Sequence, residues 1–204
     1  MTGRSKEEVV QEFRIQSIQE AAMRVIARKG MAAATMQEIA AEAGIAKGTI
    51  YLYFRDRDEL VERTFDTAMT QLHGRLEAAL QSQGSFQDRL RAMLAAKIEF
   101  FRENREFFRL YMSLRLPEGS PRQQRRHKRI CQPQFHARLA LLASFLESAM
   151  SRGEIRRMDP QRLALFLIEG SNAVVIDRVT DESPPAESSD VEFIAELLLK
   201  GIEN

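Results

Sequence analysis

Side chains suited to nucleic-acid contacts lie close together between residues 47 and 53 of this 204-residue chain. Lys47 and Thr49 can hydrogen-bond to base edges or phosphates, and Tyr51 and Tyr53 offer hydroxyls to phosphate oxygens. Gly48 has no side chain, so the backbone can come close to DNA at this position. The combination predicts a DNA contact centred on one short segment.

Two short helices joined by a glycine turn are expected to position these residues. Thr35 and Glu38 have the spacing of a capping box, which predicts a helix over residues 36–43. A second short helix is expected over residues 47–54, after the turn at Gly44. Such a helix-turn-helix places the N-terminal residues of its second helix in the major groove of DNA.

Residues 18–60 closely resemble the DNA-binding domain of the TetR family of bacterial repressors, and the layout of the remaining chain resembles that family more loosely. The resemblance implies a DNA-binding domain over residues 1–56 and an effector-binding and dimerisation domain over residues 57–204. Ala46 departs from the family pattern, since many relatives carry a polar capping residue there. The implied DNA contacts are Thr35, Gln37, Lys47, Gly48, Thr49, Tyr51, Tyr53 and Arg57, and we expect Gln37 and Lys47 to read bases.

The hydrophobic pattern of the whole chain predicts an all-α fold of about nine helices without a convincing strand. The first helix is expected over residues 18–29, and a long one from Arg57 to about Gln81. A later helix either begins or kinks at Pro133. Ser189 is expected to cap the last helix.

The C-terminal part is rich in aromatic residues, and in the TetR family effectors enter among these helices. The resemblance therefore implies an apolar pocket for a small lipophilic or acyl-type effector; plain core packing is the alternative reading for each residue. The candidate ligand-binding residues are Met69, Leu72, Met93, Phe100, Phe101, Phe107, Phe108, Tyr111, Phe135, Leu142 and Phe145.

The last two helices are too apolar for the surface of a monomer, and by family resemblance they form a four-helix interface in a homodimer. A two-fold dimer predicts a palindromic operator in double-stranded DNA, with recognition helices about 34 Å apart or somewhat wider. We expect the helix from Arg57 to couple effector binding to DNA release. The candidate interface residues are Leu163, Phe166, Leu167, Gly170, Val174, Ile194, Leu197 and Leu198.

Composition excludes several other classes of protein. The single cysteine, Cys131, rules out an internal disulfide, and His127, Cys131 and His136 are poorly placed for a metal site, so no metal or cofactor is expected. No nucleophile, dinucleotide or zinc-protease motif supports an enzyme. No signal peptide or membrane span is present, which favours the cytoplasm.

A ligand-responsive repressor is therefore the leading interpretation, although a net charge of only +1 gives DNA binding no support by itself. The alternatives are a helical interaction scaffold and a regulator without a ligand. A basic run near residue 125 is expected to be a solvated face, with docking of an anionic effector as the second reading. It comprises Arg122, Arg125, Arg126, Lys128 and Arg129.

Overall fold

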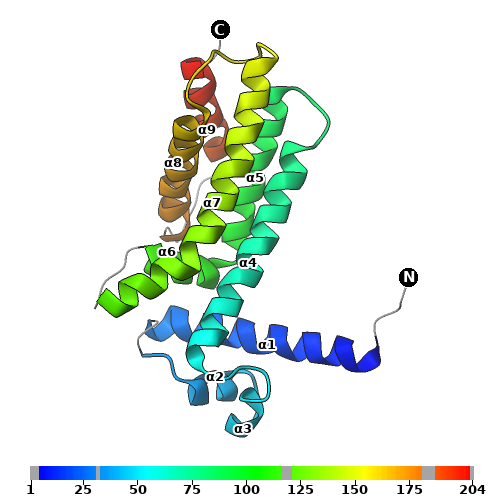
Figure 1. The fold of residues 1–204 in the computed structure, drawn as a ribbon, viewed down its shortest axis with the longest axis vertical. Helices are drawn as coiled ribbons and strands as arrows, with labels where there is room; N and C mark the ends of the chain where they lie inside the picture. The colour runs from blue at the N-terminus through cyan, green and yellow to red at the C-terminus, as the bar shows by residue number, and fades with distance from the viewer. Residues whose placement is uncertain (1–4, 31–32, 116–120, 181–186, 203–204) are drawn as a thin grey trace. The chain divides into compact units, whose positions relative to one another are not determined.

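The computed structural model describes residues 5–30, 33–115, 121–180 and 187–202, excluding the side chains of residues 113–115, 121–130, 177–180 and 187–189. These ranges contain nine helices and no strand, which confirms the all-α class (Figure 1). The helices are α1 (Lys6–Lys29), α2 (Met36–Glu42), α3 (Lys47–Ile50), α4 (Arg57–Leu80), α5 (Phe86–Glu103), α6 (Arg105–Arg115), α7 (Pro121–Ser151), α8 (Pro160–Thr180) and α9 (Glu187–Ile202).

The chain divides into two compact units. The first comprises Met1–Ala68 and Glu106–Ile130, and the second comprises Met69–Arg105 and Cys131–Asn204. The continuous helix α4 contributes its first half to one unit and its second half to the other. The domain boundary expected between residues 56 and 57 stays a prediction.

The first unit is built on α1, which packs against α2, while α2 packs against α3. Its core consists of aliphatic and aromatic side chains that recur at helical spacing along α1, α2 and the start of α4. Phe65 of α4 also contacts two aromatic rings of α6, Phe107 at 5.8 Å and Tyr111 at 6.4 Å between centroids. The largest fully buried members of the core are Ile18, Ile39, Ile50, Phe54, Leu60, Phe65 and Phe107.

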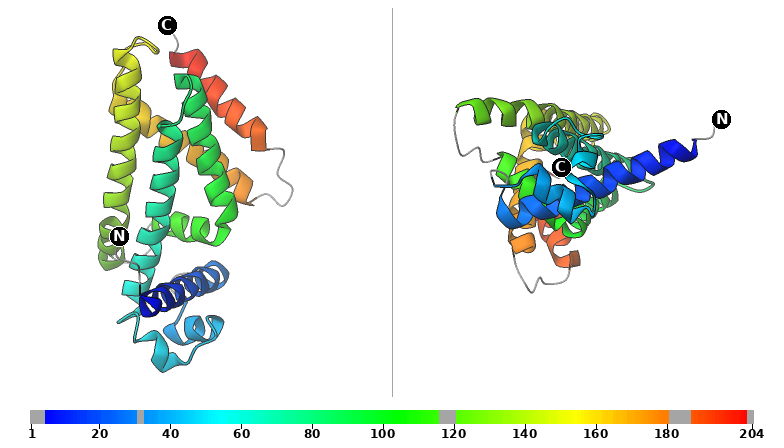
Figure 2. Two further views of the ribbon diagram at one scale, coloured as in Figure 1. Left: turned by 90° about the vertical axis from the view of Figure 1, so that its right-hand side faces the viewer. Right: turned by 90° about the horizontal axis from the view of Figure 1, so that it is seen from below.

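The second unit packs the later part of α4 with α5, α7, α8 and α9 (Figure 2). Helix α5 contacts both α8 and α9. The rings of Phe86 on α5 and Phe145 on α7 stack with centroids 5.1 Å apart. Lys97 of α5 is buried and donates hydrogen bonds to the Ile168 carbonyl (3.0 Å) and the Ser171 hydroxyl (2.6 Å) of α8. These hydrogen bonds link α5 and α8 within a largely apolar core.

Four helix boundaries differ from those expected. Helix α1 begins at Lys6, because the Ser5 hydroxyl and the Glu8 carboxylate form a capping box well before residue 18. Helix α3 ends at Ile50 and continues only as a turn. Helix α7 begins at Pro121 and contains Pro133, so the reading in which it begins at Pro133 is wrong. The expected cap at Ser189 is wrong, since α9 already begins at Glu187.

Some expectations concern residues outside the part of the chain that the structure describes. The basic run from Arg122 to Arg129 and the His127 side chain lie outside the described side chains, although their backbone belongs to α7. Within the described ranges no helix is both long and apolar enough to cross a bilayer. In that same part of the chain, no three His, Cys, Asp or Glu side chains gather closely enough to hold a metal ion.

Candidate nucleic-acid interface

The turn between α2 and α3 depends on local hydrogen bonds and on one glycine. The Thr35 hydroxyl accepts from the Glu38 backbone N–H at 3.3 Å, while the Glu38 carboxylate accepts from the Thr35 N–H at 3.1 Å, as the sequence predicts. Gly44 then adopts a φ of +69°, a left-handed conformation that side chains disfavour. The Ile45 N–H donates to the Ala40 carbonyl at 2.9 Å and closes the end of α2.

The recognition segment, which we define as residues 47–54, is fastened to the first unit through Ile50 and Phe54. Both side chains are almost completely buried. The winding of α3 continues past its end, since the Tyr53 and Phe54 N–H groups donate to the Ile50 carbonyl. Ala46 precedes α3 without a side-chain cap, as expected. This anchoring leaves the other side of the segment available to a partner.

The outward side of the recognition segment carries most of the predicted DNA contacts. Lys47, Gly48 and Tyr51 are exposed, and Thr49 and Tyr53 are half-buried. Leu52 is also exposed on this side, although sequence reasoning did not select it. Its position between two tyrosines was the available signal. Polar groups and one large apolar group therefore share the surface expected to meet DNA.

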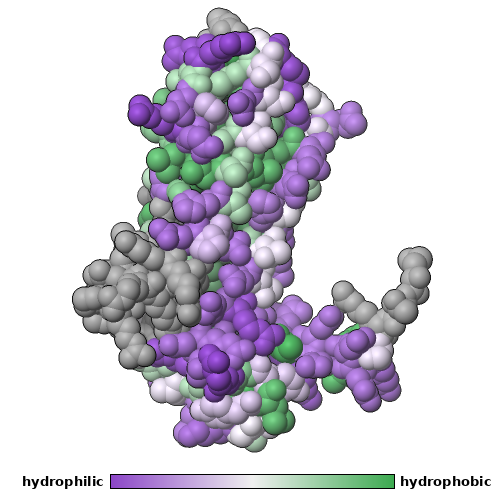
Figure 3. Space-filling view, viewed as in Figure 1, coloured by the Kyte–Doolittle hydropathy of each residue, from purple (hydrophilic) through white to green (hydrophobic). Residues whose placement is uncertain are grey.

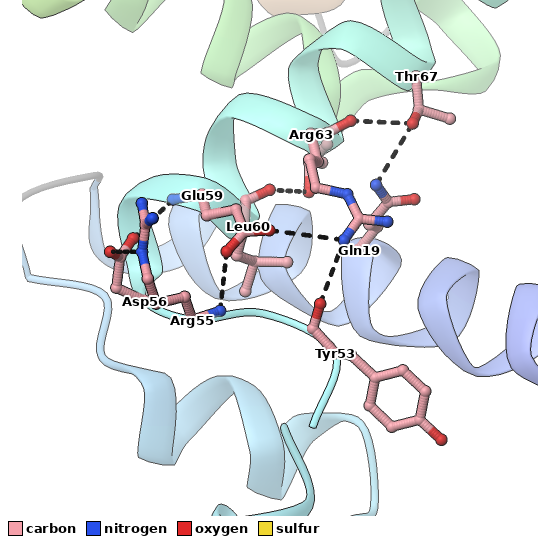
Figure 4. Close-up of polar contacts among 9 residues, drawn as sticks. Gln19, Tyr53, Arg55, Asp56, Glu59, Leu60, Arg63 and Thr67 are labelled. Carbon is pink, nitrogen blue, oxygen red and sulfur yellow. Dashed lines mark hydrogen bonds and ion pairs between the residues drawn. The ribbon is translucent and has the colours of Figure 1, made fainter. Parts of the chain in front are cut away.

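Two arginines of α4 donate to backbone carbonyls, one within the recognition segment and one just before α2. Arg63 donates to the Tyr53 carbonyl at 3.1 Å (Figure 4). Its guanidinium also lies 4.7 Å from the centre of the Phe54 ring. Arg57 donates to the Ala34 carbonyl at 3.1 Å. The guanidinium of Arg57, predicted to contact phosphate, thus also fixes the start of α2.

Two carboxylates stabilise the N-terminal turn of α4, directly after the recognition segment. The Asp56 carboxylate accepts from the Glu59 N–H at 2.8 Å, and this backbone hydrogen bond holds the pKa of Asp56 below its usual value. The Glu59 carboxylate accepts from the Arg55 N–H at 2.8 Å (Figure 4). These contacts fix how the chain enters α4 after the recognition segment.

The two predicted DNA contacts at the start of α2, Thr35 and Gln37, are both exposed. The side chain of Gln37 is exposed and is available to DNA. The hydroxyl of Thr35 accepts from the Glu38 N–H and donates to the Glu38 carboxylate at 2.9 Å. Thr35 therefore already has a structural role in starting α2, and its expected phosphate contact stays a prediction.

The acidic side chains of α2 are paired with cations of α1. Glu42 accepts from Arg24 at 2.8 Å and from Arg28 at 2.6 Å, and Lys29 pairs with Glu38. The hydrogen bonds from Arg28 and Arg24 lower the pKa of Glu42 to about 2. Pairing offsets negative charge that would otherwise repel phosphates.

The Glu42→Gln variant should lose stability in a pH-dependent way. Because the pKa of Glu42 is lower in the folded chain than its ordinary value of 4.5, its contribution is fully present above about pH 4.5. That contribution disappears as the pH falls through about 2. Melting temperatures measured from pH 7 down to pH 2 should show a gap between wild type and variant that closes with acid. The Glu20→Gln variant, which still accepts from Gln16, should track wild type, and a gap independent of pH would contradict the pairing.

The candidate effector residues fall into both compact units. Phe107, Phe108 and Tyr111 are buried in the first unit, where both phenylalanine rings lie about 6.5 Å from the Tyr111 ring. Those in the second unit are buried except Phe135, which is half-buried; they are Met69, Leu72, Met93, Phe100, Phe101, Phe135, Leu142 and Phe145. The structure brings the two groups into two apolar cores.

The candidate dimer residues separate into two sets. Leu163, Leu167, Ile194 and Leu198 are buried within the second unit, so they support its own core. Phe166, Gly170 and Leu197 are exposed, and Val174 is half-buried. Sequence reasoning missed two further exposed apolar residues of α8 and α9, Leu165 and Phe193. The exposed set, not the buried set, is available to a second copy.

Comparisons with known proteins agree with this geometry. Residues 18–64 match the family model described as bacterial regulatory proteins, tetR family. The HTH-type transcriptional regulator YhgD of Bacillus subtilis is 24% identical over 91% of this chain and 94% of that protein. The fatty acid metabolism regulator protein of the same organism is 25% identical over 91% and 93%, respectively.

A solved structure of the B. subtilis regulator FadR, in complex with stearoyl-CoA, has the same fold. Its TM-score is 0.78 at 22% identity, and the match covers 92% of this chain and 99% of that one. Similarity to these proteins therefore extends well beyond the helix-turn-helix.

Proposed function

Since this chain belongs to the tetR family of bacterial DNA-binding transcriptional regulators, we propose that it is a repressor that acts as a homodimer on a palindromic operator and is released by an acyl-type effector. Its site of action would be the cytoplasm, where bacterial DNA lies. The observation that carries the proposal is the recognition segment, which is anchored by Ile50 and Phe54 and presents Lys47, Gly48 and Tyr51 outward.

Selection of bound duplexes from a random DNA pool tests the DNA-binding half of the proposal. Purified protein at near-physiological salt should enrich a palindrome, because each copy of a two-fold dimer reads one half-site. Affinity for that palindrome should fall steeply with added salt, since bound phosphates release counterions. A pool without enrichment after repeated selection would contradict the proposal.

Lys47→Ala and Tyr51→Phe should weaken operator binding in different ways. The lysine can donate to base edges, so its loss should reduce affinity about tenfold and relax preference at one base pair of each half-site. Loss of one tyrosine hydroxyl should reduce affinity about fivefold on every sequence alike. Repeated selection with each variant measures both effects. An unchanged preference profile for Lys47→Ala would contradict the assignment of base reading to Lys47.

An acyl-type effector is supported by the character of the second unit and by the relatives. Met69, Leu72 and Phe101 give the unit a strongly apolar interior, which suits a hydrocarbon chain. Two cationic side chains, Lys97 and Arg138, are buried in the same unit and can donate to a carbonyl or an anionic group. The similar FadR of B. subtilis was solved with stearoyl-CoA.

Release from the operator by stearoyl-CoA tests the effector half of the proposal. Helix α4 continues from Arg57 to Leu80, so a shift of this helix can couple effector binding to the spacing of the recognition segments. We expect at least about a tenfold loss of operator affinity with stearoyl-CoA, and operator DNA should weaken stearoyl-CoA binding by the same factor. Free stearate and coenzyme A alone identify which part of the molecule is required. Operator affinity that is unchanged by all three compounds would contradict an acyl effector.

A further inference from the structure

Leu52 is the most exposed large hydrophobic side chain in the described part of the chain, with 81% of its surface accessible. It lies in the recognition segment between Tyr51 and Tyr53. The surface around α1 to α3 that Figure 3 shows is mostly hydrophilic to neutral, with small hydrophobic patches. A leucine contributes little to folding when its side chain faces water. Its position within the surface expected to meet DNA makes it available for apolar contact with a partner.

The backbone around Leu52 holds the side chain in a defined direction. The Leu52 N–H donates to the Thr49 carbonyl at 3.1 Å, and Phe54 anchors the following turn in the core. Positions four apart lie on the same side of such a helical turn, so Leu52 follows Gly48 along the outward side. No atom outside its own chain neighbours lies within 4 Å of the place where a Gly48 side chain would begin. Leucine therefore extends from a surface that has open space beside it.

We propose that Leu52 reads a thymine by packing against its 5-methyl group in the major groove. The thymine methyl is the apolar feature that the base edges display in that groove, whereas the other edge groups are hydrogen-bond donors and acceptors. Lys47, Thr49 and Gln37 match those polar groups, and Leu52 matches the methyl. The inference rests on the proposed function, because it requires that the recognition segment enters the groove.

Single replacement of thymine by uracil in the selected palindrome tests this contact, because uracil lacks only the methyl group. Both half-sites are changed together, one position at a time, and binding is measured for wild type and Leu52→Ala. Removing one buried methyl from each half-site should weaken wild-type binding about tenfold at one position. The same replacement should change Leu52→Ala binding less than about twofold, so the two changes are not additive.

Two further variants separate this contact from general effects. Leu52→Asn keeps a side chain of similar size and should lose the same preference for thymine over uracil. Met158→Ala removes a different exposed apolar side chain and should respond to uracil as wild type does. All variants should melt at the wild-type temperature, because the changed side chains are exposed.

The outcomes distinguish the inference from the function on which it rests. A uracil penalty that is equally large in wild type and Leu52→Ala, or that is absent at every position, overturns the role of Leu52 and leaves operator binding intact. A random pool that enriches no duplex overturns both the proposed function and the thymine contact.

Discussion

Replacing Phe166 and Leu197 together with glutamate should convert the protein into a monomer and reduce operator affinity by about a hundredfold or more. Both side chains are about 60% exposed, on helices α8 and α9 that pack against each other. Burying a carboxylate in an interface between two copies costs far more free energy than the aromatic and aliphatic contacts return. A monomer reads one half-site and loses the gain from a second linked contact.

Sedimentation velocity and operator titration measure the two parts of this expectation. Met158→Glu places the same charge on another exposed apolar position and should leave the dimer and operator affinity unchanged. The melting temperature of the double variant measured at low concentration should match that of diluted wild type, since the substituted residues lie outside the core. A double variant that remains dimeric would show that copies associate through another surface.

Phe54→Ala should destabilise the first unit by about 3–5 kcal/mol and abolish specific operator binding. The ring is almost completely buried and lies beneath the Arg63 guanidinium, so alanine leaves a cavity and removes a cation–π contact. Because Phe54 closes the recognition segment onto the core, the segment should lose its fixed orientation. Thermal or urea unfolding of the full chain and operator titration measure the two effects.

The exposed neighbour of Phe54 provides a matched control for stability. Leu52→Ala removes a comparable apolar volume two residues away, but its effect on unfolding should stay within about 0.5 kcal/mol. Arg63→Ala removes the cation–π contact without creating a core cavity, so its cost should lie between those of the other two. Comparable destabilisation by Leu52→Ala and Phe54→Ala would contradict the packing described for this segment.

The helix-turn-helix was predictable from sequence because its signals are local. Thr35 and Glu38 are three residues apart and form their capping box within one helical turn, and Gly44 marks a turn that requires a positive φ. The long start of α1 had a similar local signal in Ser5 and Glu8, which was overlooked because the residues that follow lack a buried face. The capping box marks where that helix begins, although its first turns bury no side chain.

Packing partners could not be deduced in the same way. Helix α8 is apolar on most sides, so the sequence alone could not separate Leu163 and Leu167, which face the core, from Phe166, which faces outward. The same holds for the aromatic residues expected to bind an effector. A ring that packs in the core and a ring that lines a pocket have the same sequence pattern, and Phe100 and Phe107 are both buried. Their distribution between two compact units depends on tertiary contacts that no short motif encodes.

Arg57 and Arg63 of α4 donate hydrogen bonds to backbone carbonyls, those of Ala34 and Tyr53. A carbonyl is present whatever side chain its residue carries, so these two hydrogen bonds place little demand on the identity of the intervening exposed positions. Positions such as Gln37, Lys47 and Leu52 can therefore diverge during evolution without loosening the connection to α4. New base preferences can then arise while the hydrogen bonds from α4 stay the same.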